Sequence, residues 1–191
     1  MLHPDIILKS SHISGKGLFS KSKIPRGTIV FKRKNDVRIY TKEQYYKLSK
    51  KYRDRLGDFP YEDNNDSIIH HLDNTKYGNH SCEPTVTGIP YGDAEIEIAI
   101  KDIEPNQEIT WDYGIIMPSW QKPFKCSCGS KNCRGIISRA SSRYRLANKL
   151  QLLANKAERD FFEVKQPLLS KKEFSKLGKI IRARNDICSS K

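Results

Sequence analysis

The stretch YGNHSCEP, residues Tyr77–Pro84, places a side-chain amide, an imidazole, a hydroxyl and a thiol on four consecutive residues. Four interpretations fit it: a polar loop, a metal site, a Cys/His nucleophile pair or a cofactor-binding loop. Cysteine proteases usually bring their histidine from far along the chain, which disfavours a nucleophile pair of His80 and Cys82. The choice among the other three depends on residues about 30 to 50 positions further on.

A second cluster of polar and thiol side chains, CSCGSKNCRG, covers residues 126–135. Cys126, Cys128 and Cys133 form a C-x-C-x4-C pattern without hydrophobic periodicity. Thiolates this close are typical of a zinc site, in which four ligands surround the ion at about 2.3 Å from each sulfur. Three cysteines leave either an open catalytic position or a fourth ligand from elsewhere. The candidates for that ligand are His80, Cys82 and Cys188.

The bulk properties fit one compact domain inside a cell, because 191 residues suffice to bury a core. No run of about 18 apolar residues occurs, so we predict no transmembrane helix. The start, MLHPDIILKSSH, lacks a basic segment followed by an apolar one, so we predict no signal peptide. Five cysteines, an odd number, fit reduced thiols or metal ligands. We expect an intracellular protein: nuclear or chromatin-bound in a eukaryote, otherwise cytoplasmic or delivered to a host.

The net charge of +13 is unevenly distributed along the chain. Residues 1–57 contain 15 Lys/Arg and 4 Asp/Glu, residues 58–138 contain 6 and 13, and residues 139–191 contain 14 and 5. An acidic middle segment favours a cationic substrate by attraction and steering. Basic flanking segments can bind the phosphates of a nucleic acid, and ordinary solvated surface charge explains them equally well.

Sequence patterns predict short strands with one helix between them, and two further helices after them. Strands are expected within residues 6–10, 27–34, 67–73, 94–103 and 108–113, and SGKG at 14–17 is expected to be a turn. A helix is expected over 42–56, where Thr41 and Gln44 form a capping-box pair. A second helix is expected from 138 to about 165, and a third begins after Ser170, which forms a capping-box pair with Glu173.

Three separated segments, together with the cysteine cluster, resemble the signature blocks of SET-domain protein lysine methyltransferases. The segments are SGKGLF (Ser14–Phe19), NHSCEP (Asn79–Pro84) and EITWDYG (Glu108–Gly114), and they follow one another in the family's order. CSCGSKNCRG resembles the post-SET zinc motif that follows them. Such a set is far more specific than any single block.

The resemblance implies a fold and a domain organisation. The fold is mostly β with some α: small β-sheets around a knot-like core, followed here by a C-terminal helical tail. A SET domain would cover residues 5–125, a post-SET zinc segment 126–137, and a basic helical extension 138–191.

The resemblance also implies roles for the residues that match its blocks. Tyr113 would be the catalytic tyrosine beside the transferred methyl group. S-adenosylmethionine would lie along the backbone near Gly17, because glycine lets a main chain approach closely. The cofactor-binding residues would be Lys16, Gly17, Leu18, Asn79 and His80.

One structural zinc ion is implied as well, held by Cys82 together with Cys126, Cys128 and Cys133. The resemblance places Trp111 in the substrate channel, at the position that limits how many methyl groups fit, and its size would favour mono- or dimethylation. The family often has a second tyrosine in the channel. The candidates for it are Tyr40, Tyr45, Tyr46 and Tyr61.

Two departures from the family's pattern concern the packing of the knot-like core. Thr85 follows the proline of NHSCEP, where family members often have asparagine. The residues before Asn79 are KYG, where an arginine and a phenylalanine are more usual.

Two functions follow from these observations. The first is S-adenosylmethionine-dependent methylation of a lysine in a basic protein segment, such as that of a histone. The second is a zinc-stabilised nucleic-acid-binding or chromatin-binding protein with a non-catalytic SET core. DNA or nucleosome contact through the basic tail is compatible with both, and neither involves a membrane.

Overall fold

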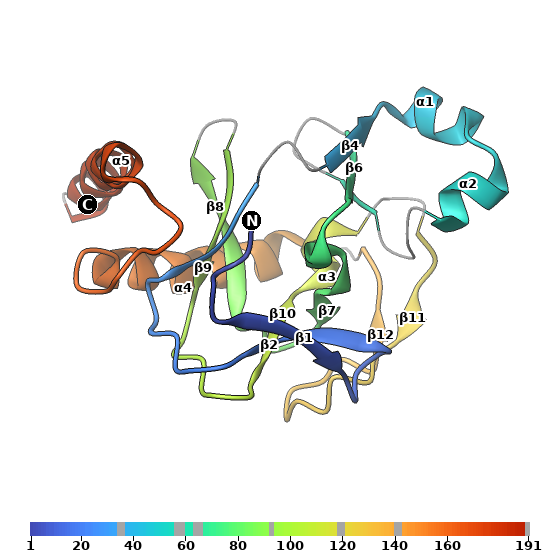
Figure 1. The fold of residues 1–191 in the computed structure, drawn as a ribbon, viewed down its shortest axis with the longest axis horizontal. Helices are drawn as coiled ribbons and strands as arrows, with labels where there is room; N and C mark the ends of the chain where they lie inside the picture. Colours follow the sequence, from blue (N-terminus) through green and yellow to red (C-terminus); the bar gives the residue numbers. More distant parts are fainter. Residues whose placement is uncertain are drawn as a thin grey trace.

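The structure of the chain is a computed structural model that describes residues 1–33, 37–55, 60–62, 67–91, 94–117, 121–139 and 143–189 (Figure 1). These residues form several small sheets with helices at both ends of the molecule. This is the β-rich architecture that the sequence predicts. Among them, no helix is both long and apolar enough to cross a membrane.

The first sheet contains four strands in the order β1-β2-β10-β7. The hairpin of β1 (Ile6–Ser10) and β2 (Lys16–Ser20) pairs antiparallel with β10 (Glu108–Trp111). The short strand β7 (Asn79–His80) lies on the other side of β10 and runs parallel to it. Sequence patterns predicted a turn over residues 14–17, but β2 already begins at Lys16, because the turn closes earlier, at Gly15, whose φ is +47°.

The second sheet is built of β3 (Ile29–Lys32), β9 (Ala94–Ala99) and β8 (Val86–Tyr91), with β9 in the centre. Ile96 and Ile98 lie on one face of β9, as the alternation predicts, and pack with α4 and α5. The opposite face is also covered, because Glu97 and Ala99 are buried. The strand is therefore buried on both faces rather than half-buried.

The third sheet, β4 (Val37–Tyr40), β6 (Ile68–His71) and β5 (Tyr61–Glu62), lies at one end of the molecule beside the helices α1 (Lys42–Lys47) and α2 (Lys50–Arg55) (Figure 1). The capping box of Thr41 and Gln44 is present. The single helix predicted over 42–56 is divided in two, because Leu48 is extended and the Ser49 hydroxyl accepts a hydrogen bond from Tyr52 N at 3.2 Å.

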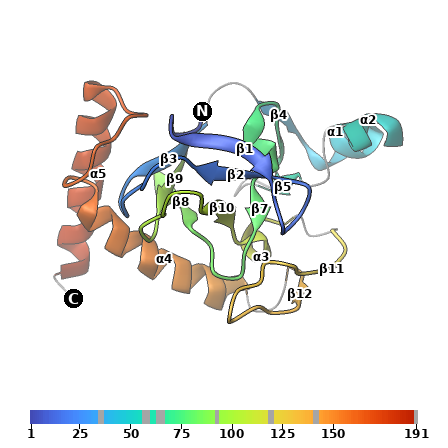
Figure 2. The ribbon, with the colours of Figure 1, turned by 60° about the horizontal axis from the view of Figure 1, so that its bottom comes forward.

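Between the sheets lie three connecting elements: the 3-10 turn η1 (Asn74–Tyr77), the short helix α3 (Tyr113–Ile116), and the ribbon of β11 (Phe124–Lys125) and β12 (Ile136–Ile137). The cysteine-rich loop 126–135 connects the two strands of this ribbon. It lies beside α3 and β7 in Figure 2.

The long helix α4 (Arg143–Asp160) crosses the second sheet, and α5 (Lys171–Ser189) packs at its far end (Figures 1 and 2). The capping box of Ser170 and Glu173 starts α5. Buried side chains of both helices share one core with the second sheet. They are Leu150, Ala154, Ala157, Phe161, Leu168, Leu177 and Ile181.

Gln166, in the connection between α4 and α5, ties the helices to the sheet. Its Oε1 accepts a hydrogen bond from Ile29 N at 2.8 Å, and its Nε2 donates to the carbonyls of Gly27 and Phe161. Gly27 has φ +90°, and a Cβ there would lie 2.9 Å from Ala157 O. The boundary between the zinc segment and the C-terminal extension at residue 138 stays a prediction. The helices after it complete a core that begins in the N-terminal strands.

Candidate active site and metal centre

The pairing of β10 with both β2 and β7 brings the three signature segments together. Ser81 N donates to Trp111 O at 2.9 Å, and the Thr85 amide donates to Thr110 O at 3.1 Å. Thr85 also accepts a hydrogen bond on its hydroxyl from Thr110 N at 2.8 Å. The threonine that departs from the family's pattern therefore joins the two segments through its own side chain.

Asn79 fixes the glycine-containing strand against this core. Its Nδ2 lies 3.0 Å from Lys16 O, 3.3 Å from Ser14 O and 2.6 Å from a Glu108 carboxylate oxygen. The other oxygen of Glu108 accepts from Ser11 at 2.8 Å. The Nδ2 group of Asn79 is thus occupied by protein atoms, and it holds the backbone of residues 14–16 in place.

His80 connects the metal centre to Tyr113. Its Nδ1 accepts a hydrogen bond from Tyr113 N at 3.0 Å, so the ring proton belongs on Nε2, which lies 3.4 Å from Cys82 Sγ. Burial lowers the pKa of His80 to about 4, against the opposing effect of Asp112. The ring is therefore neutral near pH 7 and uses both nitrogens within the protein.

Tyr113 lines a cavity to which the first, second and third sheets all contribute residues. Its hydroxyl donates a hydrogen bond to Gly78 O. Burial, together with Glu108, raises the pKa of Tyr113 above its ordinary value, so the side chain stays a phenol. The cavity is lined by Phe31, Pro60, Tyr61, His71, Thr75, Lys76, Gly78, Glu97, Trp111, Tyr113, Ile116 and Met117.

Trp111 forms one wall of that cavity, and two residues hold it there. Its indole Nε1 donates to the carboxylate of Glu97. Its six-membered ring lies against the backbone of Gly78, where a Cβ would come within 2.7 Å of Cε3 and closer still to Cζ3. Of the four candidates for a second channel tyrosine, Tyr61 alone lines this cavity, with its ring stacked on His71.

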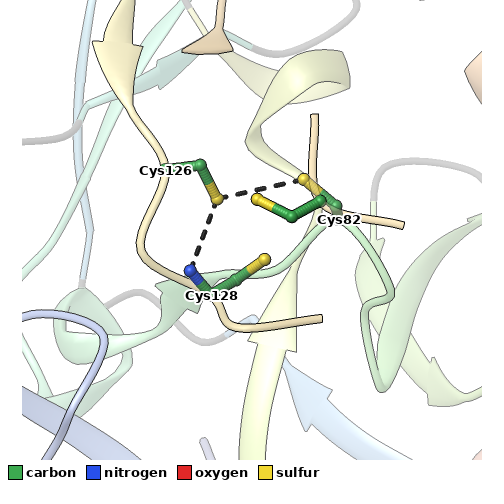
Figure 3. Close-up of side chains that lie close together, drawn as sticks. Cys82, Cys126 and Cys128 are labelled. Atoms are coloured by element: carbon green, nitrogen blue, oxygen red, sulfur yellow. Dashed lines mark hydrogen bonds between the residues drawn. The ribbon is translucent and has the colours of Figure 1, made fainter. Parts of the chain in front are cut away.

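The four predicted zinc ligands come together, with all their sulfur atoms within 4.8 Å of one another. Cys82 Sγ and Cys126 Sγ are 3.9 Å apart, close to the roughly 3.8 Å between thiolates around a tetrahedral zinc ion. Figure 3 shows the sulfurs of Cys82, Cys126 and Cys128 gathered where the cysteine-rich loop passes the segment after β7. The chemistry and spacing of the four thiols therefore fit zinc.

Hydrogen bonds around these sulfurs act against burial, which raises the pKa of Cys82 and of Cys126 above the ordinary value. Backbone amides of Arg134, Cys128 and Gly135 donate to Cys82, Cys126 and Cys133 at 3.3–3.5 Å. Burial acts to raise the pKa of Cys128, but hydrogen bonds from its surroundings outweigh burial and lower it to about 6. Of the three candidates for the fourth ligand, Cys82 occupies the position. The side chain of Cys188 lies outside the described residues.

Arg134 links the metal loop to the core strand. Its guanidinium lies 2.5 Å from the Asp112 carboxylate, whose side chain is fully buried. The same Asp112 oxygen accepts a hydrogen bond from Gly114 N at 2.9 Å and so caps α3. The metal loop and the start of α3 are therefore held by one carboxylate.

The SET-domain family model matches residues 15–114, which is more than half of the chain. The chain belongs to the SET-domain family. The matched range contains Lys16, Asn79, Trp111 and Tyr113 but ends before the cysteine loop. The cysteine cluster is compatible with the family's post-SET zinc motif.

Curated relatives of this SET-domain chain are much longer proteins. It is 29% identical over 138 residues to human histone-lysine N-methyltransferase 2B. The matched region covers 67% of this chain and 5% of that protein. It is 32% identical over 145 residues to a putative histone-lysine N-methyltransferase 1 of Plasmodium falciparum (isolate 3D7), covering 70% of this chain and 2% of that protein.

Solved structures share the fold at lower identity. A crystal structure of KRYPTONITE in complex with mCHG DNA and SAH superposes with a TM-score of 0.51 and 22% identity, covering 70% of this chain and 29% of that one. The methyltransferase domain of human SETMAR superposes with a TM-score of 0.52 at 19% identity. The match covers 72% of this chain and 58% of that one.

Sequence reasoning missed Glu97 and Gly78 as parts of the site. Glu97 follows the alternating pattern of β9, and alternation places a charged residue on the solvent side of a half-buried strand. Gly78 reads as a residue of a turn.

Proposed function

We propose that this chain transfers methyl groups from S-adenosylmethionine to a lysine side chain of a protein. The observation that carries the proposal is the cavity lined by Tyr113, whose hydroxyl is hydrogen-bonded to Gly78 O, near the strand that Asn79 holds. The relatives named as histone-lysine N-methyltransferases and the SAH in the KRYPTONITE structure support the same reaction.

The residues beside the cavity fit S-adenosylmethionine. Ser14, Gly15 and Lys16 are exposed residues, and a Cβ on Gly15 would meet nothing within 4 Å. Two cations lie near the ring of Tyr77: Lys16 Nζ is 5.6 Å and Lys76 Nζ is 5.2 Å from its centroid. These cations suit the carboxylate of the cofactor, and the aromatic face suits its adenine.

The roles of the individual residues follow from their contacts. Asn79 would hold the backbone along which the cofactor lies, rather than contact the cofactor through its Nδ2. Because both nitrogens of His80 bond protein atoms, its contribution to cofactor binding would come from its backbone and from positioning Tyr113. Leu18 is buried and would support the strand from the core side.

S-adenosylmethionine supplies an electrophilic methyl group and leaves as a thioether. The chain's task is to align a lysine nitrogen with that methyl group, and alignment provides much of the acceleration in such a displacement. Tyr113, a phenol at neutral pH, can orient the nitrogen through its hydroxyl oxygen. A dry cavity beside the cofactor's positive charge would lower the pKa of the substrate ammonium by desolvation and like charge.

One zinc ion would serve a structural role. Four thiolates leave no open coordination position, so the ion would hold the loop 126–135 against the segment after β7. Through Arg134 and Asp112, this loop supports the start of α3 and hence Tyr113. Removing zinc would therefore reduce activity by displacing Tyr113.

A lysine in a basic protein segment, such as a histone tail, is the substrate class that we propose, because the residues around the site form the acidic part of the chain. Location at chromatin, if the protein is eukaryotic, follows from that substrate.

The experiment is transfer of labelled methyl groups from S-adenosylmethionine to mixed histones and ribosomal proteins. Tyr113→Phe and a chelated sample should lose the label, whereas Tyr46→Phe, at an exposed tyrosine, should keep it. If the wild-type protein neither binds the cofactor nor labels any protein, the proposal is refuted and the zinc-stabilised binding protein is favoured.

The basic tail supports a second, compatible function, contact with DNA. Exposed side chains at Arg145, Lys149, Lys156 and Arg159 share one face of α4 by their spacing. Phosphates would bind such a row in a salt-dependent manner.

Deleting residues 138–191 would unfold the shared core, so the test is Lys149→Glu with Lys156→Glu. DNA mobility shifts should weaken relative to wild type and to Lys50→Glu, a control on α2; unchanged shifts would exclude this face.

A further inference from the structure

A buried carboxylate lies next to the cavity tyrosine on β5, and the roles given above do not use it. Glu62 follows Tyr61 on this two-residue strand, and its side chain is only 1% exposed. Successive side chains of a strand point to opposite faces. Tyr61 lines the cavity, so Glu62 points away from it, behind the cavity wall.

Two cations from distant parts of the chain hold this carboxylate. Lys42, the first residue of α1, places its Nζ 2.7 Å from Oε1 of Glu62. Arg139, two residues after β12, donates from Nη1 to Oε2 of Glu62. The Arg139 side chain is 18% exposed and that of Lys42 is 36% exposed. Because a pair that is shielded from water is screened less, Arg139 should hold the carboxylate more firmly than Lys42 does.

Such a pair fixes a position more than it adds stability. A buried ion pair is often no more stabilising than apolar residues of the same size, but its hydrogen bonds are directed and strong. The position of Glu62 constrains its neighbour Tyr61, whose ring stacks on His71 with centroids 5.4 Å apart. His71 in turn packs edge-on against Phe31 at 5.2 Å. These three rings all line the cavity.

We propose that Glu62, held by Arg139, is a positioning residue that sets the place of Tyr61 in the cavity wall and thereby the affinity for the substrate lysine. The inference rests on the proposed methyltransferase function and concerns the same cavity. The aliphatic part of a lysine would pack against this wall in the ground state and the transition state alike. A displaced wall therefore weakens substrate binding more than turnover. The cofactor, proposed to lie along residues 14–16 beside the first sheet, should bind as before.

Three substitutions disturb the pair in different ways. Arg139→Met keeps most of the side-chain stem and removes the guanidinium. Glu62→Gln keeps the shape and removes the charge, and Arg139→Lys keeps a cation. Arg26→Met is the matched control, because Arg26 pairs with Asp160 at 2.5 Å and neither is among the residues that line the described cavity.

The experiment measures kcat and two KM values, one for the protein that the transfer assay labels and one for S-adenosylmethionine. Arg139→Met and Glu62→Gln should raise KM for the protein about tenfold, the size expected when an apolar pocket loses a contact of about one methylene group. KM for S-adenosylmethionine should not change, and Arg139→Lys should lose less than Arg139→Met. Tyr61→Ala should raise KM for the protein as well. Adding Arg139→Met to it should raise KM no further, because Arg139 acts through Tyr61. Arg26→Met should behave as wild type.

A lower kcat with both KM values unchanged would mean that the pair only stabilises the fold, because unfolding removes active molecules without altering the others. That result would overturn the assignment, as would unchanged kinetics in folded variants. Effects of Arg139→Met and Tyr61→Ala that multiply in the double variant would overturn it too. If Arg139→Met fails a thermal-unfolding check, Glu62→Gln, alone and with Tyr61→Ala, decides by the same criteria. A wild-type protein that labels no protein at all fails the proposed function itself, an outcome visible before any variant is made.

Discussion

Gly78 and Trp111 are in direct contact, and the absence of a side chain at one position makes room for the large side chain at the other. The six-membered ring of Trp111 occupies the place where a Cβ of residue 78 would stand. The carbonyl of the same glycine accepts the hydrogen bond of the Tyr113 hydroxyl. A substitution at Gly78 should therefore displace both the cavity wall formed by Trp111 and Tyr113, the tyrosine that we propose as catalytic.

Gly78→Ala should lower kcat at least tenfold, because the new methyl group pushes Trp111 into the cavity or shifts the carbonyl that holds Tyr113. Combining it with Trp111→Phe removes the ring atoms that clash and should recover part of the activity. Kinetics of both single variants and the double variant give the coupling between the sites. Additive losses would show that the contact does not govern the cavity.

Metal analysis should find one zinc ion per chain, and Cys133→Ser should retain much less than one. Loss of a thiolate leaves three sulfur ligands, and structural zinc sites stabilise the folded state strongly. The variant should also melt at a lower temperature and lose methyl transfer. Cys188→Ser, the matched cysteine control, should keep both metal and activity. Equal zinc in Cys133→Ser and wild type would contradict the four-thiolate centre.

Protonation of His71 should destabilise the protein as the pH falls. Burial lowers its pKa from 6.5 to about 4, so between these values the unfolded chain binds the proton and the folded chain does not. The stabilisation is complete above pH 6.5 and is lost as the pH falls toward 4. Unfolding in urea at pH 7.5 and 5.5 should show a decrease about 1 kcal/mol larger in wild type than in His71→Phe. His71→Phe keeps a ring against Tyr61, and identical decreases in the two proteins would reject this account.

Gln166→Ala should lower the free energy of unfolding by about 3 kcal/mol. The substitution leaves Ile29 N and the carbonyl of Gly27 buried without their partner, and each such group costs about 1–3 kcal/mol. Urea unfolding measures the loss. Gln151→Ala, whose side chain bonds only Asn155 among the contacts described, should change stability by about 0.5 kcal/mol or less. A small effect at Gln166 would mean that the helices α4 and α5 are less essential to the core than their packing indicates.

Local sequence signals predicted the elements that local chemistry controls. The capping boxes at Thr41 and Ser170 need only residues three apart, so both were visible in the sequence and both are present. The family's blocks, read together, predicted the juxtaposition of the four cysteines. The break at Ser49 was missed because its N-cap competes with a helical pattern that continues on both sides.

The features that the sequence did not reveal depend on which segments meet. The contact of Gly78 with Trp111 joins residues 33 positions apart, and that of Glu97 with Trp111 joins two strands of different sheets. No periodicity within either strand encodes these contacts. Likewise, the sequence could not rank the four candidates for the second channel tyrosine. The structure places one of them, Tyr61 on β5, in the cavity wall.

The central place of β10 between β2 and β7 has a consequence for synthesis of the protein. The strands that it joins leave the ribosome first, but they have no direct pairing with each other in the sheet. A nascent chain that ends before residue 108 therefore lacks the strand that pairs with both β2 and β7, and it lacks Tyr113. Cofactor binding should arise only after translation has passed β10, so interrupted translation products would not compete with the finished protein for cofactor.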